Sequence, residues 1–223
     1  MDALTSIGNT ALQHQTKEDR VADFLREGII SGKFPRGSKL KQTELAEMIG
    51  TSITPVREAI KLLEAEGFVL GTSHRGAIVA PFDINQTEEI VDLRVTLESK
   101  LALAALARLS QQAIDELRGV QEEIEAAVER GDRDAVRALN YRFHQSMYMA
   151  AGLPQTLRFV NILWARYPFD LINRVGGRVE RASQEHQAML QAMLARDEAA
   201  MLSALRVHIR AGWDEFKANY KDG

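Results

Sequence analysis

The chain has 223 residues, of which 45% are hydrophobic and 26% charged, the composition of an ordinary globular protein with room for two domains. It has no cysteine, which excludes disulfides, thiolate metal sites and a cysteine nucleophile. Its apolar runs are too short to span a bilayer and the N-terminus shows no secretory signal, so we expect a cytoplasmic protein with no membrane partner.

The charge distribution gives only weak support to a nucleic-acid partner. The formal net charge is −3, whereas proteins that bind duplex DNA usually carry a basic surface. Residues 17–80 hold ten Lys and Arg against nine Asp and Glu. Within them is a basic run free of acids: Lys33, Arg36, Lys39 and Lys41. A solvated loop has the same appearance, so this run alone does not decide between a loop and a DNA contact.

The first helix is predicted to follow a polar tail. Residues 1–15 lack periodicity, so we expect them not to pack. Thr16 and Asp19 have the spacing of a capping box, and apolar residues at helical spacing follow them. The helix is predicted to end at Ser31, and the turn-forming residues 34–37 indicate a loop after it.

Two short helices are predicted next. Thr43 is expected to cap a helix that ends at Gly50. Thr54, followed by Pro55, is expected to cap a third helix that ends at Gly67. Two short helices joined by a tight turn that contains glycine form a helix-turn-helix.

A hairpin and a helical region complete the chain. Residues 68–70 and 77–79 are β-prone runs around a glycine-containing turn, and Pro81 closes the segment. From residue 83 onward helical patterns follow one another, and Pro168 is expected to interrupt one of them. The predicted helices lie at 86–107, 111–130, 133–150, 154–175, 178–195 and 197–220. Ser110, Asp132 and Asp197 are the expected N-caps, and breaks are expected at Gly131, Gly152 and Gly176-Gly177.

These patterns predict a mainly α fold with three parts. A disordered tail covers residues 1–15, and a winged helix-turn-helix that binds DNA covers residues 16–80. An all-α antiparallel helical bundle covers residues 83–223.

The helix-turn-helix indicates where DNA contacts are expected. Its second helix enters the major groove with its N-terminal residues at the base edges, a position held here by Thr54 and Arg57. The guanidinium of Arg57 can fork onto guanine or clamp a phosphate. The hairpin tip, with His74, Arg75 and Gly76, offers a cation for the minor groove and a close backbone approach. A small helical domain with solvent-facing arginines is the alternative, although the order of the elements favours DNA binding.

Longer motifs in this region carry a family resemblance. They are Glu44-Leu45-Ala46, Thr54-Pro55-Val56-Arg57-Glu58-Ala59, Leu63-Glu64-Ala65-Glu66-Gly67, and Arg75-Gly76 with Val79. The segment resembles the N-terminal domain of the GntR family of transcriptional regulators. The resemblance implies a homodimer whose recognition helices read a short palindromic operator.

The resemblance also implies particular DNA contacts. Base or backbone contacts fall on Thr54, Arg57, Arg75 and Gly76, with phosphate contacts by Arg36 and Lys41. The sequence departs from the family at Thr43, where some members have an arginine that touches DNA, and at Ile53, which is polar or basic in some relatives. These departures argue against a base contact from either position.

Three histidines in the C-terminal region are candidate metal ligands. Asn140 and His144 are four residues apart and therefore share one face of a helix. His186 and His208 lie on two later predicted helices that can bring their rings to a shared interior site. Neutral imidazole is a common ligand of zinc and nickel. The alternative is three unrelated histidines on half-buried faces, because histidines from separate helices have no diagnostic spacing.

The C-terminal region resembles the all-helical FCD sensor domain of the FadR-like subgroup of the same family. The phrases that carry this resemblance are Leu93-Arg94 with Leu97-Glu98, Asn140-Tyr141-Arg142-Phe143-His144, Glu185-His186 and His208. The resemblance implies a divalent metal ion, Zn²⁺ or Ni²⁺, held by His144, His186 and His208. Many relatives have an aspartate where Asn140 stands, so an amide oxygen would be a weaker ligand here.

The subgroup resemblance further implies a small organic-acid effector. Arg94 is the candidate for pairing with the effector carboxylate, and a surface pair with Glu98 is the alternative role of this arginine. Four other residues are candidates for lining a cavity: Arg142, Asn161, Trp164 and Arg166.

The sequence therefore predicts a repressor whose operator binding a small carboxylate modulates. A metal-dependent hydrolase with Glu185 as general base is one competing function, but no nucleophile elbow, phosphate loop or zinc-protease motif is present, so we expect no enzyme activity. A regulator that senses the metal ion itself is the second competing function.

Overall fold

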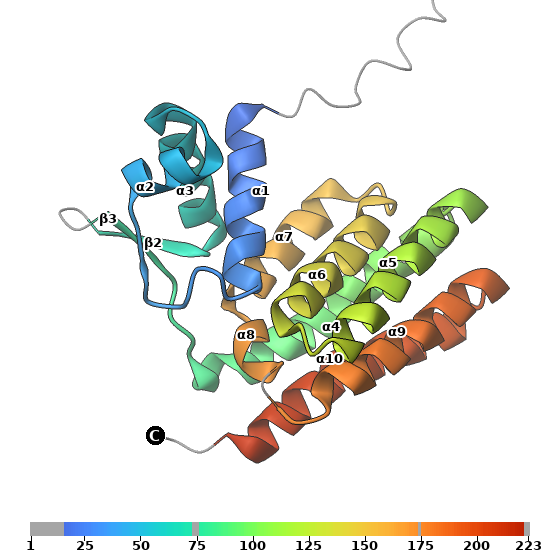
Figure 1. Cartoon of the computed structure of the whole chain (residues 1–223). Coiled ribbons are helices and arrows are strands. Elements are labelled where there is room, and N and C mark those ends of the chain that lie inside the picture. Colours follow the sequence, from blue (N-terminus) through green and yellow to red (C-terminus); the bar gives the residue numbers. More distant parts are fainter. Residues whose placement is uncertain (1–15, 73–75, 174, 221–223) are drawn as a thin grey trace, which may run out of the picture.

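The computed structural model describes residues 16–72, 76–173 and 175–220, and it confirms a mainly helical fold (Figure 1). The N-terminal part, called the head below, precedes a set of long helices called the bundle. The head elements are α1 (Lys17–Ile30), β1 (Lys39–Leu40), α2 (Gln42–Ile49), α3 (Ile53–Glu66), β2 (Val69–Thr72) and β3 (Gly76–Val79). The prediction that residues 1–15 do not pack lies outside the described residues.

Helix α1 begins as predicted, whereas α2 and α3 begin earlier. Thr16 and Asp19 exchange the two hydrogen bonds of a capping box. The N-cap of α2 is Lys41 rather than Thr43, and that of α3 is Ser52 rather than Thr54. The early start of α3 is compatible with Pro55, because the first turn of a helix has N–H groups without helical partners and a missing N–H costs little there.

The predicted hairpin is present and belongs to a three-stranded antiparallel sheet. The strand order is β1-β3-β2, with Ile78 of β3 between Lys39 on one side and Leu70 on the other. Strand β1 was not predicted, because two residues are too few to show an alternating pattern. The side chains of His74 and Arg75 at the hairpin tip lie outside the described residues.

The bundle matches the predicted helices closely. Its elements are α4 (Ile84–Leu106), α5 (Gln111–Glu129), α6 (Arg133–Met149), α7 (Pro154–Arg166), α8 (Phe169–Ile172), α9 (Arg178–Ala195) and α10 (Glu198–Asn219). Ser110, Asp132 and Asp197 are the N-caps of α5, α6 and α10, as predicted, and the side chain of each accepts a backbone hydrogen bond. The predicted helix at 154–175 is divided at Pro168, as expected of a residue without an N–H. Among the described helices, none is long and apolar enough to cross a membrane.

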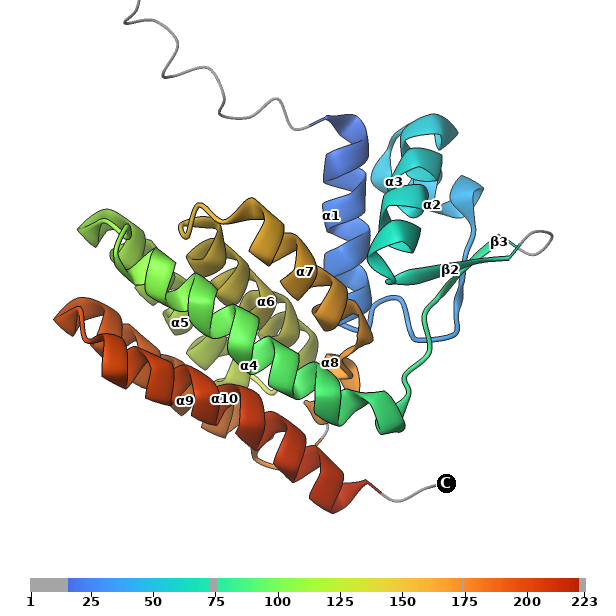
Figure 2. The same cartoon turned by 180° about the vertical axis from the view of Figure 1, so that it is seen from behind.

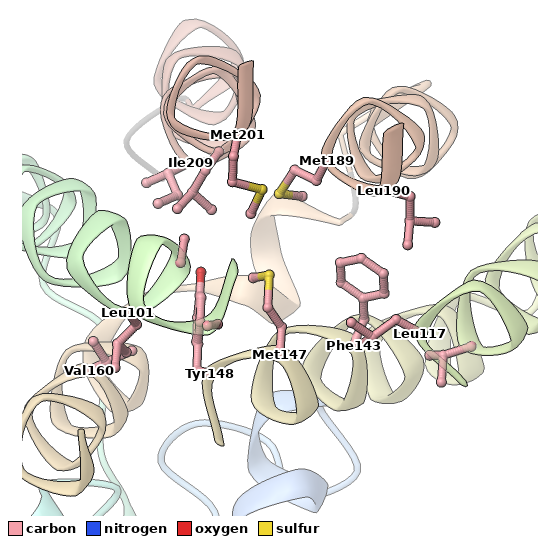
Figure 3. Packing of buried hydrophobic residues seen from close by; sticks show 14 of the residues in the cluster. Leu101, Leu117, Phe143, Met147, Tyr148, Val160, Met189, Leu190, Met201 and Ile209 are labelled. Carbon is pink, nitrogen blue, oxygen red and sulfur yellow. The ribbon is translucent and has the colours of Figure 1, made fainter. Parts of the chain in front are cut away.

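Helix α6 is central to the bundle core. Figure 3 shows the thioethers of Met147, Met189 and Met201 pointing toward one another, with Phe143 beside them, and all four side chains are buried. The buried face of α6 continues through His144. A histidine on this face is therefore held inside the bundle rather than at its surface.

The head packs against the bundle through its own core. Figure 1 and Figure 2 both place α1 between the bundle and the remaining helices of the head, and the contacts with the bundle run from α1 to α6 and from α3 to α7. The head core includes the fully buried Leu25, Val56 and Leu63 and also Ala165 from the end of α7. The two parts of the chain therefore share apolar contacts in addition to the connecting segment.

Two glycines test the predicted helix end at Gly50. Gly50 ends α2 with φ of +74°, whereas Gly119 lies inside α5, and a Cβ built on either meets no heavy atom within 4 Å. We expect Gly50→Ala to lower the free energy of unfolding by about 1 kcal/mol through left-handed backbone strain. Gly119→Ala should raise it by about 0.5–1 kcal/mol, because alanine favours a helix interior. Urea unfolding followed by circular dichroism measures both, and equal effects of the two substitutions would contradict the backbone argument.

Candidate functional site

The three candidate histidines converge in the interior of the bundle. His144 comes from α6, His186 from α9 and His208 from α10. The Nε2 atom of His144 lies 3.2 Å from Nε2 of His186 and 3.1 Å from Nε2 of His208. The rings are 4%, 1% and 9% exposed, respectively. Three ring nitrogens from three helices thus face one small volume that is closed to water.

The outer ring nitrogens of two histidines are held by oxygen acceptors. The side-chain nitrogen of Gln121 donates to Ser183 and Glu125, which directs its Oε1 to Nδ1 of His186 at 3.1 Å. Nδ1 of His186 therefore carries the hydrogen and its Nε2 presents a lone pair.

The same arrangement holds for His208. Its Nδ1 lies 2.8 Å from Oε2 of Glu185, and Arg178 contacts both oxygens of this carboxylate at 2.8 and 2.5 Å. Glu185 therefore lies on the Nδ1 side of His208, away from the converging Nε2 atoms. This position does not suit the general base that a hydrolase would need.

The cluster keeps its rings neutral. Burial lowers the pKa of all three histidines, and for His144 and His186 the value falls well below 6.5 because each also faces another histidine. Neutral rings are the form that binds a metal ion.

The donor set fits a divalent cation. The Nε2 atoms of His186 and His208 both present lone pairs to Nε2 of His144. A neutral His144 carries a single ring hydrogen and therefore cannot satisfy both lone pairs. The Nδ1 atom of His144 has no hydrogen-bond partner. Ligands about 2.0–2.1 Å from one tetrahedral zinc ion lie roughly 3.3 Å apart, close to the separations of the His144 pairs. A shared cation would remove the repulsion between the lone pairs.

Two small cavities adjoin the histidines. Both are lined by Arg94, Asn140, Phe169 and His208, so Asn140 lies beside the cluster as predicted from its spacing. The space open to the centre of a water molecule is about 30 Å³ in one cavity and about 10 Å³ in the other. A water molecule needs roughly 10–15 Å³ by this measure, so the cavities hold about two or three waters in all.

Arg94 is a buried cation at the wall of these cavities. Its Nε donates to Glu98 at 2.7 Å, and its guanidinium lies 4.1 Å from the ring centre of Tyr167. Glu98 also accepts hydrogen bonds from Tyr148 and Trp164. The pair of Arg94 and Glu98 is present, but it is buried, so the alternative of a surface pair is wrong.

The structure adds one cation that the sequence analysis missed. Arg178 is 3% exposed and lines the larger cavity near His208. The only sequence signal near Arg178 is the break at Gly176 and Gly177, which indicates the start of α9 but not a buried cation. Of the four further candidates, Trp164 lines the smaller cavity, whereas Arg142 lines two other pockets, away from the histidines, and pairs with Glu123. The other two line neither cavity: Asn161 and Arg166.

The DNA-contact candidates on α2 and α3 are at the surface. Thr54 and Arg57 are exposed on the first turns of α3, and Nε of Arg57 lies 3.5 Å from Oε1 of Gln42. Lys41 is exposed at the start of α2 and pairs with Glu44 at 2.6 Å. Gly76 is the first residue of β3, directly after the hairpin tip. These positions leave Thr54, Arg57 and Lys41 accessible to a duplex.

Arg36 does not have the position that a phosphate contact requires. Its guanidinium donates to Asp170 at 3.1 Å and to the carbonyl oxygens of Ala165 and Tyr167 at 3.2 and 2.7 Å. The side chain is only 13% exposed. The expectation that Arg36 contacts phosphate is wrong for this arrangement, because its donors are already used between the head and the bundle.

Two family descriptions match the chain. Residues 17–79 match "Bacterial regulatory proteins, gntR family", and residues 89–211 match the FCD domain. The first match contains the helix-turn-helix and the hairpin, and the second contains all three converging histidines.

Relatives and a solved structure agree with these matches. The chain is 30% identical to a "Probable D-xylose utilization operon transcriptional repressor" of Paenarthrobacter nicotinovorans, over 90% of this chain and 88% of the relative. It is 28% identical to the "HTH-type transcriptional repressor GlaR" of Escherichia coli, over 83% and 89%. The fold is similar to E. coli McbR/YncC, with a TM-score of 0.81 at 23% identity over 92% of this chain and 99% of that one. The two relatives are named as repressors of transcription, not as enzymes.

Proposed function

Because this chain belongs to the GntR family of bacterial regulatory proteins and carries an FCD domain, we propose that it represses transcription under the control of a small carboxylate bound beside a divalent metal ion. It is a transcriptional regulator rather than an enzyme. The repressor assignment draws on relatives that are named repressors, two of which are described above. Such a regulator works in the cytoplasm, where the chromosome lies.

The observation that carries the metal proposal is the convergence of three Nε2 atoms in a buried, neutral cluster. His144, His186 and His208 would hold the ion, with the amide oxygen of Asn140 as a weaker neighbour. A bound Zn²⁺ or Ni²⁺ supplies an open coordination position that a carboxylate oxygen can fill. Gln121 and Glu185 keep the two flanking rings turned toward the centre.

The effector class follows from the cations at the cavity wall. Arg94 and Arg178 both line the cavity next to His208, and a guanidinium binds a carboxylate by two parallel hydrogen bonds. Both arginines already pair with an internal carboxylate, so neither is an uncompensated charge. A small acid would contact Arg94 and reach toward the histidines from the same cavity.

Operator binding is proposed to involve two copies of the head. A homodimer places two α3 helices on successive major grooves and therefore favours a palindromic site. Arg57 and Thr54 would approach base edges, Lys41 would contact phosphate, and His74, Arg75 and Gly76 would approach the minor groove.

The metal proposal makes a direct prediction. Chain purified from cells grown with added zinc or nickel should contain about one divalent ion per chain, by elemental analysis. His186→Ala should lose most of this metal, because it removes one of the three converging nitrogens. Gln187→Ala, at the exposed neighbouring residue of α9, is the control and should keep it. Wild-type chain without metal, or His186→Ala with a full complement, would overturn the proposal.

The effector is tested separately from the metal. In a thermal-shift screen of small organic acids, an acid at about a hundred times its Kd should add about 2.7 kcal/mol of stability. A chelator should abolish the shift, and the same acid should weaken operator binding. If zinc alone weakened operator binding and no acid had a further effect, the chain would be a metal sensor and the carboxylate proposal would fail.

Arg57 is expected to read bases. On an operator obtained by selection from random DNA, Arg57→Ala should weaken binding by about 1–3 kcal/mol and relax the sequence preference. Arg130→Ala, at an exposed arginine at the end of α5, is the matched control and should have little effect. Fluorescence anisotropy measures both, and unchanged affinity in the Arg57 variant would remove this residue from the interface.

A further inference from the structure

Arg36 connects the head to a short segment of the bundle. It lies in the loop between α1 and β1, and its partners Ala165, Tyr167 and Asp170 belong to the end of α7 and to α8. It also donates to the carbonyl oxygen of Ala80, at 3.3 Å, where the head ends. One guanidinium from this loop thus contacts three residues of the segment 165–170 and the C-terminal end of the head.

The same segment forms a wall of the cavities beside the histidines. Tyr167 lies against Arg94 and lines the larger cavity, and Phe169 lines both cavities. Ile30, at the end of α1, lines the smaller cavity together with His144. The head therefore takes part in closing the space next to the histidines, directly through Ile30 and indirectly through Arg36.

The cavities are too small for an organic acid. They have room for about two or three water molecules. Ligand pockets usually measure several hundred Å³. A carboxylate with even a few carbon atoms can enter only if part of the wall moves. The segment 165–170 is the part of the wall best able to move. It is short, it is irregular at Tyr167 and Pro168, and the side chain that holds it, Arg36, belongs to the head.

We propose that Arg36 and Asp170 form a latch that couples the effector cavity to the head. With the latch closed, the segment 165–170 closes the cavity and the head is fixed on the bundle. Entry of an acid displaces Tyr167 and Phe169, withdraws the acceptors of Arg36 and releases the head. Because coupling is reciprocal, opening the latch must also open the cavity. The inference rests on the proposed function for the identity of the ligand, but not for the coupling itself.

The pair of Arg36 and Asp170 is suited to this role. Their side chains are 13% and 12% exposed, so removal of either partner leaves a largely buried charge on the other. A second contact, from Nε of Arg137 to the carbonyl oxygen of Ser31, does not involve the segment 165–170. The head can therefore stay attached through Arg137 while the latch is open.

Hydrogen–deuterium exchange on the full-length chain tests the coupling. Arg36→Ala changes only the head, and Asp170→Asn changes only the bundle and keeps the side-chain shape. Each should speed amide exchange about tenfold or more in both residues 32–38 and residues 165–173. The double variant should resemble Arg36→Ala, because that substitution already removes the pair with Asp170 together with the contacts to Ala165 and Tyr167. Arg118→Ala, which breaks an exposed pair with Asp115, is the control and should leave both segments unchanged. Faster exchange confined to the substituted side would overturn the latch.

Access to the histidines gives an independent measurement. Wild-type chain loaded with Zn²⁺ should release it slowly to a coloured chelator, and both latch variants should release it several-fold faster, whereas Arg118→Ala should match wild type. Equal release rates in all four proteins would contradict the latch even if zinc is bound as proposed. If the wild-type chain binds no zinc, the metal proposal fails, and the exchange pattern still decides whether the two segments are coupled.

Discussion

The bundle is organised around three neutral imidazoles whose lone pairs meet in a dry interior. Burial is the largest cause that keeps these rings neutral, and neighbouring positive charges add to it; Gln121 and Glu185 then turn the flanking rings so that Nε2 faces inward. This geometry accounts for polar groups on faces that are otherwise apolar. Gln121 is fully buried on α5. Its side-chain nitrogen donates to Ser183 and Glu125, which leaves its oxygen to accept a hydrogen bond from Nδ1 of His186. These polar contacts add to the apolar packing that holds α5, α6, α9 and α10 together.

The charges around the site are balanced in pairs. Arg94 pairs with Glu98, and Arg178 pairs with Glu185. Neither guanidinium near the cavity is therefore an isolated buried charge. An incoming anion must share these arginines with carboxylates already in place. Its binding energy through the arginines alone is therefore modest, and under the proposed function an oxygen bound to the metal ion would add the remainder. This favours acids that present two oxygen donors close together over simple anions.

Local signals in the sequence predicted local structure well, but they could not predict contacts between residues far apart in the chain. Caps at Asp132 and Asp197 and the break at Pro168 depend on neighbouring residues, so their prediction needed no knowledge of the fold. The spacing of Asn140 and His144 indicated a shared face, although convergence with His186 and His208 rested on a family resemblance, since distant histidines carry no spacing. Arg36 was assigned to DNA by the family resemblance and by its place in a basic run. Its true acceptor, Asp170, is 134 positions away, and no local pattern reports such a contact.

Under the proposed latch, the position of Arg36 would let a small ligand control a whole domain. The apolar contact between head and bundle, centred on Ala165, favours attachment but has little directional preference. A buried ion pair contributes little net stability because its desolvation offsets its attraction, yet it fixes one orientation through directed hydrogen bonds. A ligand therefore does not have to overcome the whole interface to change the orientation of the head. It has to move only the few acceptors that Arg36 uses, and these belong to the segment that walls the cavity.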